Sequence, residues 1–301
     1  MIFDDLKAFV AVMELGSITR AANKLSLTQS AVSRRIQSLE DSLQVQLFNR
    51  SIKPPTPAAI AHRIYEYAVP LLKDVKQLID AAHQDATPFG TFRLGLTQMA
   101  SDIAVFKTIS GMKATFPKLD FQIQTSWSAA LQHLLEQGRL DAATLMLPSP
   151  SSPLSGMAGK HIATLNVLIV QSKAHRIVKG KTSIKSLSSQ DWILNPQGCG
   201  YRLALQRAME NVGADFRLSV DTHDTESQLQ MVSSGLGLGM VPKLMLDKSA
   251  YKSELSVVEV TDFALKLDLW LMHPENLGNL KAALDIVALS LSEGFKKRQT
   301  E

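Results

Sequence analysis

The sequence predicts an N-terminal all-α domain of the winged helix-turn-helix type, a long linker helix, and an α/β C-terminal domain. Two short amphipathic segments around a tight turn, within residues 16–39, predict the first part. A seven-residue apolar repeat after about residue 57 predicts the linker helix. From residue 91 onward, strand patterns alternate with helix patterns, which is typical of an α/β domain with a largely parallel sheet.

The two helices of the first part are marked by residues that favour helix starts. Ser17 precedes the first helix, in which Ala21 and Ala22 are small enough to let a second helix approach closely. Thr28 precedes the second helix, where apolar residues recur at steps of four, three and four. This stripe, which we expect to be buried, consists of Val32, Ile36, Leu39 and Leu43.

The opposite side of the second helix carries side chains suited to the major groove of DNA. Glutamine pairs with adenine, arginine with guanine, and serine with either base. A turn of about 100° per residue places such side chains opposite the apolar stripe, with one arginine at the flank. They are Gln29, Ser30, Ser33, Arg34 and Gln37, with Arg35 at the flank. The alternative is an ordinary solvated face on a three-helix domain.

Basic residues are concentrated around this motif, although the whole chain has a net charge of only +4. Between residues 20 and 53 there are six basic residues and two acidic ones. A local excess of positive charge is what a DNA-docking surface requires. We assign base reading to Gln29, Ser33, Arg34 and Gln37, and phosphate contacts to Ser30, Arg35, Arg50 and Lys53.

A short strand and a proline-stiffened loop follow the second helix. Leu47 and Phe48 predict the strand, and residues 50–57 predict the loop, where a wing would lie. Thr56 followed by Pro57 is typical of a helix start, so we expect the linker helix to run from there to about residue 84. Pro70 should kink it or loosen one turn.

Two heptad series run along the linker helix. Ile64, Leu71 and Leu78 form one, and Ala68, Val75 and Ala82 form the other. Because they lie between two predicted domains, we interpret them as the seam of a homodimer. The alternative is that the stripe packs against the core of the same chain.

The segments FRLGL, FQIQTS, AATLML, VLIVQ and WIL predict strands of the C-terminal domain. Helical patterns lie at residues 102–115, 129–137, 201–212 and 225–234. Ligands of such sheets bind at the carboxyl ends of the strands. The corresponding loops are residues 97–101, 126–128, 147–149, 195–202 and 222–225. Gly235, Gly237 and Gly239 are interpreted as a helix stop followed by a closely packed strand, with ligand contact as the alternative.

Composition and motifs argue against several other classes of protein. The 301 residues, 45% of them hydrophobic, suffice for two or three packed units, and we see neither a secretory signal nor a membrane-spanning run. The single cysteine, Cys199, excludes an intrachain disulfide and suits a reducing interior, so we expect a cytoplasmic protein. No P-loop, zinc-protease, CxxC or nucleophile-elbow spacing occurs, and we expect neither an enzyme nor a metal site.

Short motifs occur along the chain in a recognisable order. In the N-terminal part they are Leu6-Lys7-Ala8-Phe9, Gly16-Ser17, Ala21-Ala22, Leu25, residues 28–33 (TQSAVS), Ile36, Leu39-Glu40 and Leu47-Phe48-Asn49-Arg50. In the C-terminal part they are Leu94-Gly95, Phe116-Pro117, residues 138–141 (GRLD) and residues 232–242 (VSSGLGLGMVP). In these features the chain resembles LysR-type transcriptional regulators over nearly its whole length. It departs from them at Gln44 and Gln46, where that family usually has glycine and proline, and in a wing with fewer arginines.

The resemblance implies a C-terminal domain with the two-lobed fold of periplasmic binding proteins. The implied domains are residues 1–58 for DNA binding, 59–87 for the linker and dimerisation helix, and 88–301 for effector binding. Lobe I covers about 88–162 and 267–301, and lobe II covers about 163–266. The implied partners are double-stranded promoter or operator DNA, a small-molecule effector of unknown identity, and further copies of the chain in a homodimer and homotetramer. No other cofactor is implied.

The implied effector pocket lies between the lobes. Its candidate residues are Thr97, Gln98, Met99, Ser101, Ser126, Trp127, Asn195, Tyr201, Arg202, His223 and Thr225. We expect Ser101 to open a helix whose amides suit a carboxylate or phosphate, and Arg202 to add a charge. Trp127 is alternatively a plain core aromatic.

Other functions compete with effector sensing. The C-terminal domain of a constitutive repressor or DNA-architectural protein would only oligomerise. A free-standing binding protein is opposed by the DNA-reading helix. Cys199 suggests redox sensing, since the family includes peroxide sensors and Arg202 is near enough in sequence to lower the thiol pKa. The alternative is a passive small residue.

Overall fold

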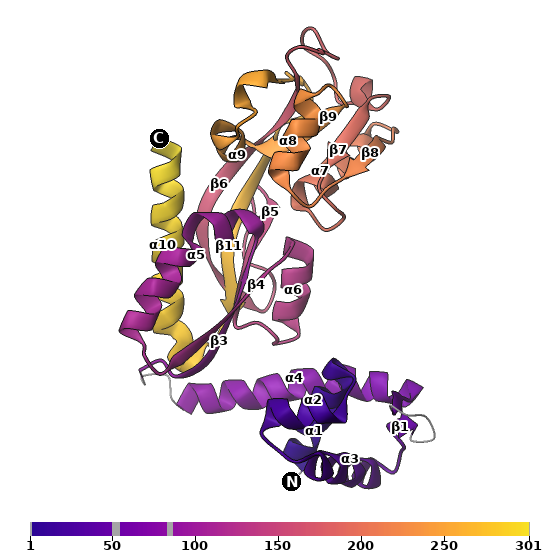
Figure 1. Ribbon diagram of the computed structural model, residues 1–301, viewed down its shortest axis with the longest axis vertical. Helices are drawn as coiled ribbons and strands as arrows, with labels where there is room; N and C mark the ends of the chain where they lie inside the picture. The colour runs from indigo at the N-terminus through magenta and orange to yellow at the C-terminus, as the bar shows by residue number, and fades with distance from the viewer. Residues whose placement is uncertain (1, 50–54, 83–86, 301) are drawn as a thin grey trace. The chain divides into compact units, whose positions relative to one another are not determined.

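The computed structural model describes residues 2–49, 55–82 and 87–300, and it divides the chain into two units, residues 1–85 and 86–301. Figure 1 shows the helices and strands of both units. Each unit has its own hydrophobic core.

The first unit contains three packed helices, a small hairpin and a long helix. The helices are α1 (Ile2–Leu15), α2 (Ile18–Leu25), α3 (Gln29–Leu43) and α4 (Ala59–Ala82). The hairpin strands are β1 (Phe48–Asn49) and β2 (Thr56–Pro57). Side chains from α1, α2, α3 and β1 form the core, including Phe9, Ala21, Val32, Leu39 and Phe48.

Both predicted helix starts of the helix-turn-helix are confirmed. The Ser17 hydroxyl accepts a hydrogen bond from the Arg20 amide at 3.3 Å, and the Thr28 hydroxyl accepts one from the Ala31 amide at 3.2 Å. Between the two helices, Ser26 has a left-handed backbone with φ of 54° and ends α2. The chain therefore turns within Ser26 and Leu27, as the sequence predicts.

The apolar stripe of α3 is buried except at its end. Val32, Ile36 and Leu39 are in the core, whereas Leu43 is 36% exposed, so its predicted burial is wrong. The reason is that α3 ends at Leu43 and the left-handed Gln44 (φ 53°) turns the chain away. Glu40 holds this corner from inside, because its buried carboxylate accepts hydrogen bonds from the Leu47 and Phe48 amides at 2.8 and 3.1 Å.

The start of the linker helix differs from the prediction. Thr56 and Pro57 form β2, which pairs antiparallel with β1, and α4 begins only at Ala59. Pairing with the strand therefore prevails over the local helix-start signal. The helix then continues through Pro70 to Ala82.

The two heptad series of α4 have different surroundings. Ala68 is buried in the core of the first unit, and Ile64 packs against that core. Leu71 and Leu78 are 50% and 72% exposed, and Tyr67 and Ile79 are exposed as well. The side chain of Ala82 lies outside the described set. Part of the stripe thus packs on its own chain, and part faces outward.

The second unit is built on one mixed sheet, with strand order β4-β3-β5-β11-β6-β9-β7-β8 and β10 paired to β6. The strands are β3 (Gly90–Leu96), β4 (Leu119–Thr125), β5 (Ala142–Pro148), β6 (Met157–Ser172), β7 (Asp191–Leu194), β8 (Arg217–Asp221), β9 (Leu238–Pro242), β10 (Leu255–Val257) and β11 (Leu265–Pro274). The expected largely parallel sheet is corrected, because β6 and β11 run antiparallel to each neighbour with which they pair.

Two long strands connect the two lobes. The first part of β6 pairs with β11 beside β5, and the last part of β6 pairs with β9 and β10. Lobe I therefore contains β3, β4 and β5, lobe II contains β7, β8, β9 and β10, and β6 and β11 cross between them (Figure 1). In this layout, the ends of the shorter strands of one lobe lie close to those of the other lobe.

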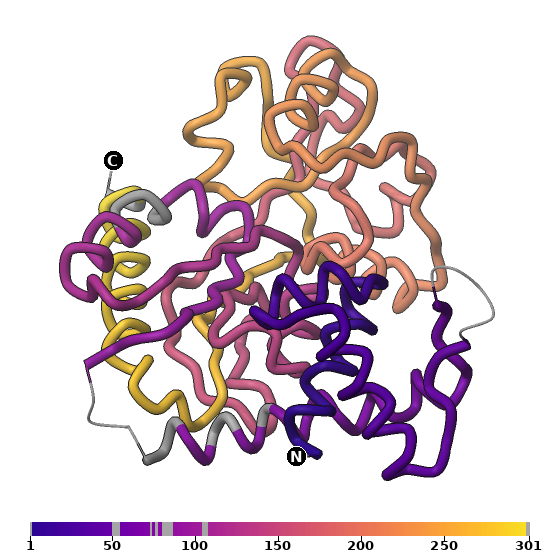
Figure 2. Tube along the Cα trace, turned by 60° about the horizontal axis from the view of Figure 1, so that its bottom comes forward, coloured from indigo at the N-terminus to yellow at the C-terminus, as the bar shows by residue number. Residues whose placement is uncertain are grey.

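The described residues 87–300 form six α-helices around the sheet: α5 (Gln98–Thr115), α6 (Ser128–Glu136), α7 (Gly200–Asn211), α8 (Thr225–Ser233), α9 (Lys243–Lys248) and α10 (Lys281–Thr300). The C-terminal α10 lies beside α5 in both ribbon and tube views (Figures 1 and 2). Arg298 of α10 donates a hydrogen bond to the Asp102 carbonyl of α5 at 3.1 Å. The end of the chain is thereby held against lobe I.

The glycines of residues 235–239 have structural roles, as the sequence predicts. Gly235 follows α8 with φ of 85°, a backbone that favours glycine after a helix. A Cβ on Gly237 would lie 2.5 Å from the Asp191 carbonyl oxygen. Larger residues at these positions would collide with the neighbouring backbone or strain the turn.

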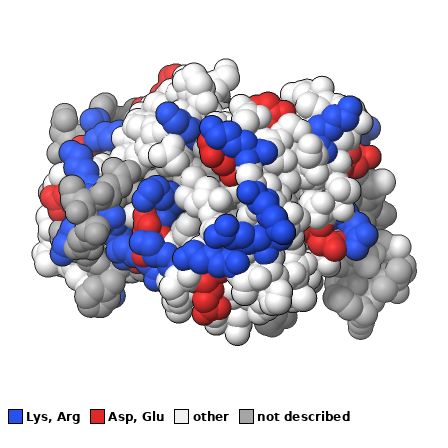
Figure 3. Space-filling model, turned by 90° about the horizontal axis from the view of Figure 1, so that it is seen from above, with Lys and Arg blue, Asp and Glu red and all other residues white. Residues whose placement is uncertain are grey.

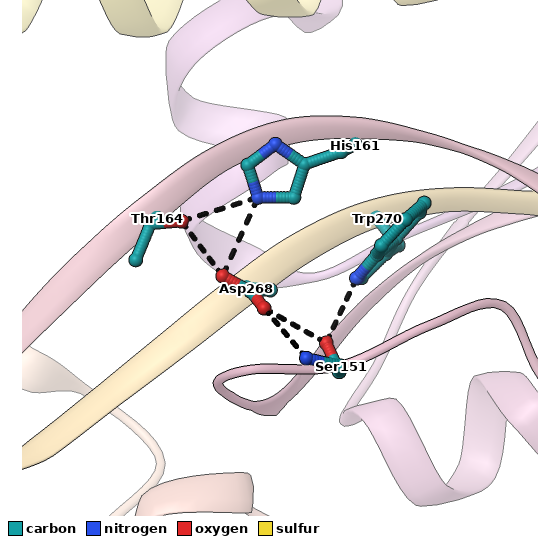
Figure 4. Close-up of polar contacts among 5 residues, drawn as sticks. All are labelled: Ser151, His161, Thr164, Asp268 and Trp270. Atoms are coloured by element: carbon teal, nitrogen blue, oxygen red, sulfur yellow. Dashed lines mark hydrogen bonds and ion pairs between the residues drawn. The ribbon is translucent and has the colours of Figure 1, made fainter.

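A buried carboxylate ties the crossing strands to the loop after β5 (Figure 4). Asp268 on β11 accepts hydrogen bonds from the Ser151 amide and hydroxyl, each at 3.0 Å, and from the Thr164 hydroxyl at 2.7 Å. His161 lies 3.4 Å away and Trp270 donates to Ser151 at 2.9 Å. A register shift between Leu269 and Trp270 lets His161 and Thr164, three residues apart on β6, reach the same carboxylate.

The environment of Asp268 fixes its ionisation. Burial by itself raises the carboxyl pKa, but hydrogen bonds from Thr164, Ser149 and Ser151 stabilise the carboxylate more strongly and lower the pKa to about 2. The aspartate is therefore charged throughout the neutral range and serves as an acceptor only.

Replacing Gln44 by glycine should stabilise the first unit, by about 1 kcal/mol, because glycine adopts the left-handed backbone without steric cost. Slower hydrogen exchange of the α3 amides would report the gain. Gln46→Gly, at an exposed residue without positive φ, is the matched control and should give no stabilisation. Equal exchange in wild type and Gln44→Gly would contradict the prediction.

Asp268→Ala should destabilise the second unit by about 1–3 kcal/mol at pH 7, because the Ser151 and Thr164 donors lose their acceptor. Urea unfolding followed by tryptophan fluorescence isolates this unit, since Trp127, Trp192 and Trp270 all belong to it. The folded-state pKa lies below the unfolded value, so the contribution is present above about pH 4 and is lost as pH falls toward 2. Asp120→Ala, an exposed strand residue, should change little.

Candidate nucleic-acid interface and ligand cleft

The predicted reading residues of α3 share one solvent-facing side. Gln29, Ser30, Ser33, Arg34 and Gln37 are exposed, and Arg35 is half-buried. Because Val32, Ile36 and Leu39 hold the other side of the helix in the core, this face is fixed in orientation. The geometry therefore presents these polar side chains together, while their contact with DNA stays a prediction.

The contacts of these side chains separate them into two kinds. Within the described part of the chain, Arg34 donates to the Ser30 carbonyl of its own helix at 3.4 Å, and Gln37 donates to Asp41 at 2.8 Å. The Arg35 side chain instead extends toward α1, where its guanidinium lies 3.5 Å from the Asp4 carbonyl oxygen. Arg34 is thus the more available of the two for a base. The predicted phosphate contacts Arg50 and Lys53 lie outside the described residues.

A cleft of about 120 Å³ lies between the lobes of the second unit. Its walls come from the carboxyl ends of β3 and β4 in lobe I and of β7 and β8 in lobe II, together with the first turns of the helices that follow. It is lined by Thr97, Gln98, Met99, Asp102, Trp127, Met146, Asn195, Tyr201, His223, Asp224, Thr225, Glu226, Pro242 and Met245. This is where open α/β sheets commonly bind ligands.

Eight of the eleven predicted pocket residues line the cleft: Thr97, Gln98, Met99, Trp127, Asn195, Tyr201, His223 and Thr225. Ser126 does not line it, and its amide donates to the Leu96 carbonyl. Ser101 does not line it either. Helix α5 begins at Gln98, and the Ser101 amide already donates to the Thr97 carbonyl, so the expectation that Ser101 opens the helix is wrong.

Arg202 is also absent from the lining. Its guanidinium donates to the Asn195 carbonyl at 3.1 Å and pairs with Asp221 at 2.9 Å. The positive charge expected in the pocket is therefore engaged by a lobe II aspartate. It orders the loop that carries Asn195 instead of facing the cleft.

Six further residues line the cleft: Asp102, Met146, Asp224, Glu226, Pro242 and Met245. Asp224 lies within the predicted loop 222–225 but was not named as a candidate, and sequence reasoning missed the other five. Two of the six carried a readable signal. Asp224 is the N-cap of α8 and accepts a hydrogen bond from the Ser227 amide at 2.7 Å, and Glu226 lies in the first turn of that helix. Hydrogen bonds from Ser227 hold the pKa of the Asp224 carboxyl below its usual range.

Two helices begin at the cleft without a side-chain cap. The N-cap residues of α5 and α6 are Thr97 and Trp127, and neither side chain accepts a capping hydrogen bond. The first amides of an α-helix have no partner within the helix. The lobe I side of the cleft therefore offers backbone donors.

Two family models match the sequence. Residues 3–60 match the model described as "Bacterial regulatory helix-turn-helix protein, lysR family", and residues 85–293 match the "LysR substrate binding domain". The chain belongs to the LysR family. Its helix-turn-helix and its two-lobed domain are the two parts that these models describe.

Curated relatives of this LysR-family protein are HTH-type transcriptional regulators. YofA of Bacillus subtilis is 24% identical over 83% of this chain and 85% of its own length. CzcR of Bacillus anthracis is 27% identical over 79% of each chain. CysL of Bacillus subtilis is 24% identical over 93% of this chain and 94% of its own length.

Solved structures show the same fold. Full-length OxyR C199D from Pseudomonas aeruginosa has a TM-score of 0.72 at 19% identity and covers 97% of this chain and 94% of that one. Full-length CbnR in complex with its target DNA has a TM-score of 0.56 at 17% identity and covers 96% of this chain and 100% of that one. Among the described residues of the present LysR-family protein, none of the helices has the length and apolar character needed to cross a membrane.

The environment of Cys199 opposes the expected effect of Arg202. The thiol is buried, and burial raises its pKa to about 11, outweighing the backbone hydrogen bonds at Arg202 and Tyr201 and the charge of Arg202. A thiol with such a pKa is almost entirely protonated at neutral pH, whereas the thiolate is the reactive form. The geometry of this LysR-family protein therefore favours the passive role of Cys199.

Cys199 should react with a disulfide reagent such as DTNB about 100-fold more slowly in the folded protein than in denaturant, because burial suppresses the thiolate. Absorbance of the released thiolate at neutral pH measures both rates. The protein unfolded in guanidinium is its own control, since this is the single cysteine of the chain. Comparable rates in the two states would contradict the passive role.

Proposed function

We propose that this LysR-family regulator reads operator DNA with the outer face of α3 and is controlled by a small molecule bound in the cleft between its lobes. The observation that carries the proposal is a fixed, exposed row of polar side chains on α3 in a chain that also contains a cleft. Base reading is proposed for Gln29, Ser33, Arg34 and Gln37. Phosphate contact is proposed for Ser30, Arg35, Arg50 and Lys53.

The proposed assembly is a homodimer through α4, and a homotetramer on DNA. Its support is the outward apolar face of α4, where Tyr67, Leu71, Leu78 and Ile79 expose large side chains in the single chain. Covering such a face removes apolar surface from water, which favours association. A dimer would present two α3 helices to two half-sites.

We further propose that the protein acts in the cytoplasm, where its DNA is, and that it regulates without catalysing a reaction. A ligand between the lobes changes DNA binding only if it binds one arrangement of the assembly more tightly than another. The proposed effector site consists of the eight predicted lining residues and the six additional ones named above.

Selection of genomic fragments with purified protein at near-physiological salt tests the function. A spaced, partly palindromic sequence upstream of a few genes is the expected result, because a dimer reads two half-sites. Diffuse binding without such a sequence would instead indicate an architectural DNA-binding protein.

Arg34→Ala should weaken binding to the selected operator about tenfold or more and relax its sequence preference, because a bidentate arginine contact discriminates between bases by about 1–3 kcal/mol. Binding to random DNA should change much less. Fluorescence anisotropy with both DNAs measures the two losses. Arg63→Ala, an exposed arginine on α4, is the control. An equal loss on both DNAs would assign Arg34 to phosphate contact.

A further inference from the structure

The charged side chains that line the cleft all have the same sign. Asp102 comes from lobe I, and Asp224 and Glu226 come from lobe II. In the described part of the chain, no lysine or arginine lines the cleft, although Lys and Arg side chains are spread over the face of the molecule shown in Figure 3. A chain with net charge +4 thus has a cleft that attracts positive charge.

Each of these carboxylates is held by a neighbour and retains capacity to accept further hydrogen bonds. Gln98 donates to Asp102 at 2.8 Å, the Ser227 amide to Asp224 at 2.7 Å, and the Ser249 hydroxyl to Glu226 at 3.0 Å. An ionised carboxylate offers about four lone-pair sites, so one such contact does not exhaust it.

The buried side-chain oxygen of Asn195 independently calls for a ligand that donates a hydrogen bond. Asn195 lines the cleft at the end of β7 and is only 1% exposed, and its side-chain oxygen has no hydrogen-bond partner among the described residues. Leaving a buried acceptor unpaired costs about 1–3 kcal/mol. A ligand that donates a hydrogen bond to this oxygen would remove that cost.

The aromatic side chains of the cleft are compatible with an organic cation. Trp127 and His223 both line it, with ring centroids 6.2 Å apart and ring planes tilted by 41°. The face of an indole attracts ammonium groups. A bare metal ion is disfavoured, since among the described residues no group of three His, Cys, Asp or Glu side chains is close enough to hold one.

We propose that the cleft binds a small ligand that carries a protonated amine. An ammonium group has three donors and no acceptor, which matches the Asn195 oxygen and the carboxylates of Asp224 and Glu226. The volume of about 120 Å³ restricts the ligand to a small molecule, since a cavity of roughly 150 Å³ holds benzene. This inference rests on the proposed function, because it names the class of effector for the same site.

The ammonium group has two sources that the structure accommodates, a simple amine and an amino acid. The lobe I wall contains the uncapped starts of α5 and α6, where backbone amides attract a carboxylate. An amino acid would place its ammonium group at lobe II and its carboxylate at lobe I. A simple amine would use only the first of these interactions.

Matched sets of compounds test the proposal on the full-length protein. Each set contains an amino acid, the amine left by removing its carboxyl group, and the acid left by removing its amino group, for example L-valine, isobutylamine and 3-methylbutanoate. A member present at 100 times its Kd should raise Tm of the second unit by about 5–10 °C. We expect the amino-bearing members of at least one set to do so and its acid not to. A larger shift with the amino acid than with the amine identifies the amino acid as the source.

Substitutions of the lobe II carboxylates test whether the amine binds in the cleft. Asp224→Asn preserves the helix cap, because asparagine also caps helices, and Glu226→Gln preserves the acceptor for Ser249. The double variant should bind the amine at least about fivefold more weakly while binding operator DNA as before without ligand. Glu210→Gln, on α7 outside the cleft, is the control and should leave the affinity unchanged.

The outcomes separate this inference from the function on which it rests. Stabilisation by acids alone overturns the amine class and leaves an effector-controlled regulator. Amine binding that is unchanged in the double variant also overturns it. If no compound shifts Tm while the protein still selects operator DNA, the amine class is overturned and the DNA-reading part of the proposed function remains.

Discussion

The second unit depends on the pairing of β6 with β11, the two strands that cross between the lobes. Every other strand of the sheet belongs to one lobe, so these two strands carry the sheet from lobe I into lobe II. The buried Asp268 fixes the crossing from one face, because it binds the loop after β5 and a hydroxyl of β6 at once. The cleft exists because the shorter strands end where these two continue.

Local signals in the sequence were sufficient for the helix-turn-helix. Caps at Ser17 and Thr28 and an apolar stripe on α3 are properties of neighbouring residues, and all are confirmed apart from Leu43. The predictions were wrong where the conformation of a segment is set by pairing with another segment of the chain. Thr56 and Pro57 pair with β1, which no local pattern at a proline-rich segment indicates.

The sequence predicts the loops that form the cleft better than the individual residues that line it. Its loops follow from the strand ends, and eight named residues line it. The role of Arg202, on α7, was predicted wrongly because its partner Asp221 lies on β8, further along the chain. The role of Ser101 was predicted wrongly because α5 begins a turn earlier than its pattern indicates. The acidic character of the cleft is not apparent in the sequence, because its carboxylates come from both lobes. Sequence separation of more than 100 residues divides Asp102 from Asp224.

The contact between α10 and α5 links a helix outside the cleft to the wall of the cleft. Arg298 donates to the carbonyl of Asp102, a residue whose side chain lines the cleft. A displacement of α10 would therefore reach the backbone of α5 beside the cleft. Experiments that compare ligand binding between variants should leave α10 unaltered.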